Sequence, residues 1–188
     1  EDIEQINREL SLENTSFQLL TGTEVDVMSD GSLDFEDSLL AKLDVVVASI
    51  HQGFTQSRNQ LTQRLIKAAE NPTVHMLGHM SGRLLLQREP YAIDHQSVID
   101  ACARTGTWIE LNASPYRLDM DWRWWRYAKE KGVKCVINCD AHHLDHAGFL
   151  RLGAEHARKG WLEKRDIINT LPLADLKAEL AKKRKSIS

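Results

Sequence analysis

Five short apolar segments alternate with segments of helical periodicity, and this alternation limits the folds available to the chain. The apolar segments have strand-like lengths and span residues 17–27, 43–51, 74–79, 107–112 and 134–139. The helical segments span 1–13, 33–40, 57–70, 94–105, 120–131, 146–159, 166–169 and 173–183. Strands that alternate with helices are typical of parallel sheets with helical crossovers. The sequence therefore predicts an α/β fold with about five parallel strands and helices outside them.

Polar side chains lie at or near the end of each predicted strand. In chain order they are Glu24, His51, His79, Asn112, Asp140 and His142. In barrels of parallel strands the carboxyl ends share one face, where the chemistry takes place. Residues two apart in an extended chain point the same way, so we expect the side chains of Asp140 and His142 to project together.

All of these residues except Asn112 are good metal ligands. Mixed imidazole and carboxylate sets suit Zn²⁺, Mn²⁺ or Fe²⁺ better than Ca²⁺ or Mg²⁺ alone. We therefore predict a metal site, and a shared carboxylate in such a site can bridge two ions for phosphoryl chemistry. The alternative left open is that the five are separate surface or core residues. The predicted ligands are Glu24, His51, His79, Asp140 and His142.

Charge and cysteine content narrow the classes of function. The net charge of −3 argues against a domain that holds nucleic acid by charge alone. Three cysteines, an odd number, predict reduced thiols and a cytoplasmic setting. No apolar run approaches the length of about 20 residues that spans a membrane. We expect one domain over residues 1–180 and a solvated basic tail over 181–188.

Several motifs resemble those of a known superfamily. They are 22–26 (GTEVD), 47–54 (VASIHQGF), 77–85 (LGHMSGRLL), 109–119 (IELNASPYRLD) and 137–142 (INCDAH). Together they look like consecutive motifs of the PHP (polymerase and histidinol phosphatase) superfamily. The stretches 77–85 and 109–119, with REPY at 88–91 between them, resemble the PHP domain at the carboxyl end of bacterial family X DNA polymerases. The resemblance runs from about residue 3 to residue 180.

The resemblance implies a distorted seven-stranded (βα) barrel that binds up to three metal ions, usually Zn²⁺ or Mn²⁺. It implies 3′–5′ exonuclease chemistry on DNA ends through metal-activated water. The five predicted ligands fall on ligand positions of the family, and Glu24 falls on a bridging position. Glu24 and Asp140 are thus the expected catalytic carboxylates. The partners implied are the 3′ end of DNA and a polymerase region upstream.

The family's first motif, His-x-His, has no counterpart, since no histidine precedes His51. We therefore expect an incomplete barrel that lacks its amino-terminal part. An open barrel exposes the edge of its first strand, which predicts homodimerisation or strand exchange.

Four further residues are candidates for substrate contact. A guanidinium fork suits phosphate, so we expect Arg83, Arg88 and Arg117 to contact the DNA backbone. Asn112 is a candidate for orienting a water molecule or donating to phosphate. Surface salt bridges and a strand-end cap are the alternatives for these residues. Among the tryptophans that could stack on bases, Trp124 is expected to be the most exposed.

Two other functions remain open. One is a small-molecule phosphatase of the histidinol-phosphatase type. The other is a catalytically inactive structural fragment that keeps the fold and binds little metal.

Overall fold

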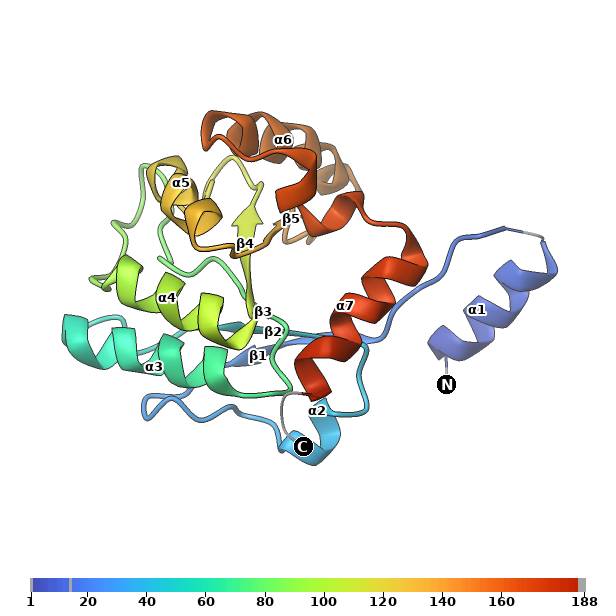
Figure 1. Cartoon of the computed structure of the whole chain (residues 1–188), viewed down its shortest axis with the longest axis horizontal. Coiled ribbons are helices and arrows are strands. Elements are labelled where there is room, and N and C mark those ends of the chain that lie inside the picture. The colour runs from blue at the N-terminus through green and yellow to red at the C-terminus, as the bar shows by residue number, and fades with distance from the viewer. Residues whose placement is uncertain (1, 14, 186–188) are drawn as a thin grey trace.

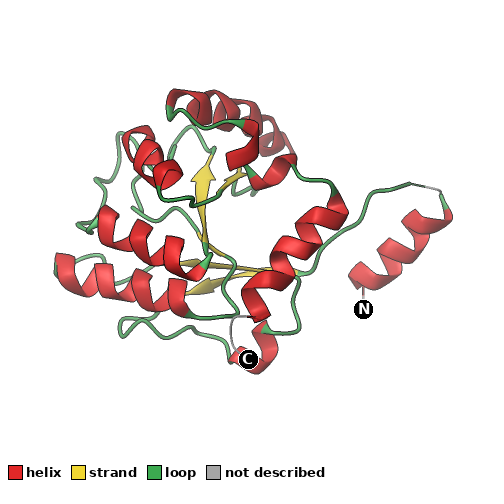
Figure 2. Cartoon of the chain, in the orientation of Figure 1, coloured by secondary structure: helices red, strands yellow, loops and turns green. Residues whose placement is uncertain are grey.

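The fold is given by a computed structural model, which describes residues 2–13 and 15–185 (Figures 1 and 2). The helices are α1 Asp2–Leu12, α2 Asp37–Leu40, α3 Arg58–Glu70, α4 His95–Thr105, α5 Trp122–Glu130, α6 Leu150–Lys159 and α7 Leu173–Lys185. The strands are β1 Gly22–Asp26, β2 Val45–Ser49, β3 Met76–Leu77, β4 Trp108–Asn112 and β5 Cys135–Asn138. Short 3₁₀ helices cover Leu144–Phe149, Lys164–Asp166 and Ile168–Thr170.

The five strands form one parallel sheet in sequence order, β1-β2-β3-β4-β5. Every predicted strand is present, and the predicted α/β class with five parallel strands is confirmed. The arrangement is compatible with an incomplete barrel of the expected kind. Because all strands run the same way, their carboxyl ends meet along one edge.

Alternation of side chains along the strands separates the core into two layers. Leu77, Ile109 and Ile137 face the larger layer, which they share with residues of α3, α4, α5 and α6. Their sequence neighbours Met76, Trp108 and Val136 face the opposite way, toward Ile168 and Leu180, the latter in α7. The sheet is therefore covered by four helices on one face and by α7 on the other (Figure 1).

Some elements are shorter than predicted. Residues 17–21 precede the pairing of β1 with β2, which begins at Gly22 and Val45, so the first strand is shorter than 17–27. An isolated bridge between Val27 and Leu33 holds the chain extended, and α2 begins only at Asp37. α1 has no buried residue and projects away from the rest of the chain (Figure 1).

The basic stretch expected as a tail continues α7 through residue 185, while 186–188 lie outside the described residues. Lys183 is buried, and its Nζ donates to the carbonyl oxygens of Ala69 and Thr105 and to Oγ1 of Thr107. This part of the basic stretch therefore caps the ends of α3 and α4. Within the described part of the chain, no helix has the length and apolar character needed to cross a membrane.

Candidate metal centre

Glu24, His51 and His79 converge at the carboxyl edge of the first three strands. Nε2 of His79 lies 3.0 Å from Oε1 of Glu24, and Nε2 of His51 lies 3.5 Å from the same oxygen. One ligand atom from each residue lies within 4.8 Å of the other two. Three of the five predicted ligands are thus brought together around a point that a single ion can occupy.

Asp26 fixes the orientation of the His51 ring. Its Oδ1 makes a short hydrogen bond with Nδ1 of His51, which leaves Nε2 directed at Glu24. Contacts with His51 and His79 hold the pKa of Glu24 well below its ordinary value. The hydrogen bonds with Glu24 and then with Asp26 raise the pKa of His51 to about 9. Without a metal, His51 is therefore protonated at neutral pH, and an incoming cation must displace that proton.

The buried His79 indicates that these residues fit a metal ion. Its side chain is almost fully enclosed, and its Nδ1 has no hydrogen-bond partner. An unpaired polar atom in the interior costs free energy unless another interaction offsets the cost. A carboxylate and two imidazoles, one held by an outer carboxylate, form a common ligand set for Zn²⁺ and Mn²⁺.

Gly78 makes room for this cluster. A Cβ at this position would lie 2.4 Å from Oγ of Ser49, 2.9 Å from Cγ1 of Val47 and 3.5 Å from Oε1 of Glu24. We expect Gly78→Ala to lower the free energy of unfolding by about 1–3 kcal/mol, as overpacking does. The shift forced on Ser49 and on Val47, which pairs with Glu24 in the sheet, should also weaken Mn²⁺ binding by about tenfold, measured by isothermal titration calorimetry.

Gly148→Ala is the matched control, because a Cβ there meets nothing within 4 Å. It should leave the free energy of unfolding and the Mn²⁺ affinity unchanged. Wild-type metal affinity in Gly78→Ala would contradict the tight packing inferred around Glu24.

Asp140 and His142 lie together but outside the three-residue group. Their side chains approach to 3.8 Å between Nδ1 and Oδ1, and Nδ1 of His142 also contacts the carbonyl oxygen of Asp140 at 2.7 Å. His142 is exposed, whereas Asp140 contacts Arg117 and Asn112, each at 3.5 Å. Both line a cavity of about 320 Å³ that also includes Arg117 and His146. The structure therefore divides the predicted ligands into a set of three and a set of two.

The predicted substrate contacts differ in their surroundings. Arg83 is held by the carbonyl oxygens of Arg117 and Leu118 and by Asp121. Arg88 donates through Nε to the carbonyl oxygen of Gly82, and its guanidinium lies 4.5 Å above the Phe54 ring.

Two other predicted contacts lie next to Asp140. Nη1 of Arg117 is buried without a hydrogen-bond partner, while Nε pairs with Asp140. Asn112 is fully buried and donates to Glu110.

Sequence reasoning missed two buried carboxyl groups that hold the segment 79–81 after β3. Glu110 accepts hydrogen bonds from the backbone N–H of His79 and from the amides of Asn112 and Asn138. Asp119 accepts from the N–H and hydroxyl of Ser81. Burial raises the pKa of both groups. The available signal was an acid, Glu110, inside the otherwise apolar run 107–112.

Trp124 was expected to be the most exposed tryptophan, and this expectation is wrong. It is partly buried and packs against the larger core layer, because α5 turns it toward α4. Trp161 is more exposed, at 53%.

Histidine and carboxylate side chains at the carboxyl edge of a parallel sheet define the class of protein: an α/β domain with a group of side chains that could hold a metal ion. No protein-family model matches the chain. Curated proteins do match. The chain is 40% identical over 171 residues to the "DNA polymerase/3'-5' exonuclease PolX" of Bacillus subtilis (strain 168), which covers 91% of this chain and 30% of that protein.

Two probable phosphatases are also similar. The one from Thermoanaerobacter sp. (strain X514) is 28% identical over 180 residues, covering 90% of this chain and 71% of the relative. The one from Syntrophotalea carbinolica is 32% identical over 102 residues, covering 53% of this chain and 40% of the relative. The resemblance to the PHP superfamily found in the motifs is thereby confirmed. It spans less than a third of the length of the Bacillus relative.

Proposed function

We propose that this chain is a metal-dependent phosphoesterase domain that hydrolyses DNA from its 3′ end. The observation that carries the proposal is the Glu24–His51–His79 group at the carboxyl edge of the sheet. A bound Zn²⁺ or Mn²⁺ would supply a Lewis acid and a water molecule activated at neutral pH. Similarity to a protein described as a polymerase and 3′–5′ exonuclease supports DNA as the substrate, and the lower identity to probable phosphatases makes a small phosphate ester the second candidate.

The residues have distinct proposed roles. Glu24, His51 and His79 hold one ion, and Asp26 keeps the Nε2 atom of His51 directed toward it. Asp140 and His142 contribute further ligands from the neighbouring cavity.

Three arginines and Asn112 are proposed to contact the substrate or to position the residues that do. Arg117, with its unpartnered Nη1, and Arg88 contact phosphate. Arg83 lies on the same loop as Arg88 and ties it to the segment of Arg117 through hydrogen bonds to the carbonyl oxygens of Arg117 and Leu118. Asn112 orients Asp140.

Further parts of the proposal concern partners and setting. A polymerase region, such as the Bacillus relative has by name, would present the DNA end. The free thiols of Cys102, Cys135 and Cys139 support a cytoplasmic location. We also propose a role in DNA repair. A homodimer through the edge of β1 is proposed because this strand is first in the sheet.

The test compares two substrates with the same purified chain. A 5′-labelled single-stranded oligonucleotide should shorten stepwise from its 3′ end with Mn²⁺ or Zn²⁺, and a chelator should stop the reaction. Phosphate release from histidinol phosphate should be slower. Asp140→Ala should abolish trimming, whereas Asp145→Ala, which removes an exposed carboxylate from the same segment, should not.

The other outcomes separate the alternatives. Hydrolysis of histidinol phosphate alone would favour the small-molecule phosphatase. Absence of hydrolysis together with absence of bound metal after dialysis would favour the inactive fragment.

A further inference from the structure

A second cavity lies beside the loop that follows β3, on the other side of Leu84 from the cavity of Asp140. Its volume is about 320 Å³, at the small end of the range for sites of small molecules. Leu84 lines both cavities. Ser81 also lines it and is two residues from the metal-centre residue His79. The cavity therefore adjoins the proposed metal centre through one short loop.

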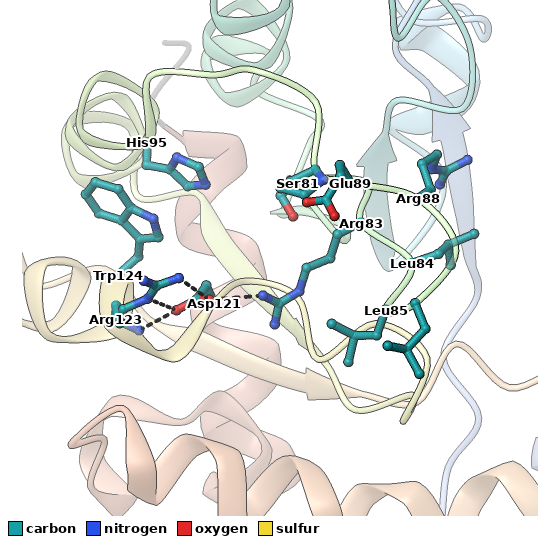
Figure 3. Close-up of a pocket in the computed structure, with 12 residues that line it drawn as sticks. Ser81, Arg83, Leu84, Leu85, Arg88, Glu89, His95, Asp121, Arg123 and Trp124 are labelled. Carbon is teal, nitrogen blue, oxygen red and sulfur yellow. Dashed lines mark hydrogen bonds and ion pairs between the residues drawn. The ribbon is translucent and has the colours of Figure 1, made fainter.

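One wall of this cavity is a pair of stacked aromatic rings. His95, the first residue of α4, lies parallel to Trp124 of α5, with ring centroids 4.6 Å apart and an interplanar angle of 4° (Figure 3). Burial lowers the pKa of His95 to about 4, so its ring is neutral at physiological pH. Two stacked, uncharged rings thus line the cavity, and such rings favour a planar base as an occupant.

A set of charged side chains lies beside this wall (Figure 3). Asp121 accepts from Arg83 on one side and from Nε and Nη2 of Arg123 on the other (Figure 3). These mutual hydrogen bonds hold the three side chains in place. Arg88 also lines the cavity, and only its Nε donates a hydrogen bond to a described residue. Its guanidinium lies over the Phe54 ring, and a guanidinium fork suits a phosphate at the edge of the cavity.

The mouth of the cavity includes an apolar side chain without packing partners in the described structure. Leu86 is fully exposed and has a φ of 65°, which is unfavourable for a branched side chain. Leu85, next to it, is also partly exposed. An exposed leucine held in a left-handed conformation is consistent with a rim that contacts an occupant.

We infer that this cavity binds the base of the terminal nucleotide of a DNA strand. The inference rests on the proposed function and extends it from the phosphodiester to the base. The uncharged pair of stacked rings in the lining favours a planar base over a second phosphate or a peptide. With the base beside Trp124, the DNA backbone would follow the loop of residues 79–88 toward Arg88 and the metal centre.

The test measures binding without metal, so it is independent of hydrolysis. Two labelled single-stranded oligonucleotides are compared in the presence of a chelator by fluorescence anisotropy. They are identical except that one ends in a normal 3′ nucleotide and the other in a stable abasic analogue. Wild-type chain should bind the normal end about tenfold more tightly, as expected for one stacked base. Equal affinity, or binding of neither oligonucleotide, would overturn the inference.

Variants assign the preference to this cavity. Trp124→Leu should bind both oligonucleotides with equal affinity, and Trp124→Phe, which keeps a ring, should retain part of the preference. Trp161→Leu is the control, since Trp161 is exposed and outside the cavity. If Trp124→Leu does not fold, His95→Ala replaces it, because this change removes the other ring of the pair. A full preference in a folded variant that lacks either ring would contradict the assignment.

Failure of this inference differs from failure of the proposed function. Trimming of both oligonucleotides without any base-dependent binding would reject the base pocket and keep the phosphoesterase. Base-dependent binding without hydrolysis would keep the pocket and reject the phosphoesterase.

Discussion

Glu24→Gln is expected to lower the affinity of the chain for Mn²⁺ by at least about 100-fold and to reduce DNA trimming to background. Oε1 of Glu24 is the atom that faces both His51 and His79. An amide lacks the negative charge that offsets the charge of the ion. Loss of an outer partner of a ligand costs about 10–100-fold, so loss of the charged ligand itself should reach or exceed that range. Isothermal titration calorimetry measures the affinity.

Stability should respond differently in this variant. Glu24 and His51 are each more than a third exposed, so their ion pair is screened by solvent and contributes at most about 1 kcal/mol. The amide oxygen of glutamine can still accept a hydrogen bond from Nε2 of the buried His79. The metal-free variant should therefore unfold close to the wild-type denaturant midpoint. Glu155→Gln, at an exposed position of α6, is the control for loss of one negative charge. Wild-type Mn²⁺ affinity in Glu24→Gln would exclude the three-residue group as the binding site.

The sheet and the group formed by Glu24, His51 and His79 were predictable because they depend on local periodicity. Each apolar run becomes a strand of a parallel sheet, and parallel strands place their ends together. Glu24, His51 and His79 follow three neighbouring strands, so their proximity needs only the strand order. The proximity of these three residues and the five strands could therefore be predicted from the sequence alone.

The rest of the site depends on contacts between segments distant in sequence. Asp119 contacts Ser81 across 38 residues, and no pattern within either segment indicates that pair. The stacking of Trp124 on His95 depends on how α4 and α5 pack. Asp140 has a φ of 50°, so the chain leaves the extended path there, and alternation no longer fixes where His142 points. This local turn is one physical reason why His142 is exposed.

Glu110 connects the two sets of predicted ligands. Its Oε2 accepts from the backbone N–H of His79 at 2.7 Å and from Nδ2 of Asn112 at 3.3 Å. The same Nδ2 atom lies 3.5 Å from Oδ2 of Asp140. Oε1 of Glu110 accepts from Nδ2 of Asn138 at 3.1 Å. One buried carboxyl group thus positions the backbone of a ligand in the first set and, through Asn112, a carboxylate in the second.

Glu110→Gln is therefore expected to lower the free energy of unfolding of the metal-free chain by about 1–3 kcal/mol. Three donors point at this side chain, and glutamine offers one acceptor oxygen and one NH₂ group in place of two oxygens. At least one buried donor then faces another donor, which leaves a polar group unsatisfied at a cost of about 1–3 kcal/mol. Urea denaturation in the presence of a chelator measures the change.

The comparison with Glu24→Gln separates positioning from ligation. Both variants should bind Mn²⁺ more weakly, but only Glu110→Gln should also lose stability in the absence of metal, because only Glu110 is buried among donors. The expected loss of affinity is about 10–100-fold, the range for residues that orient ligands. An unchanged urea midpoint would show that the amide finds other partners. In that case the two ligand sets are held by their strands alone and not through this carboxyl group.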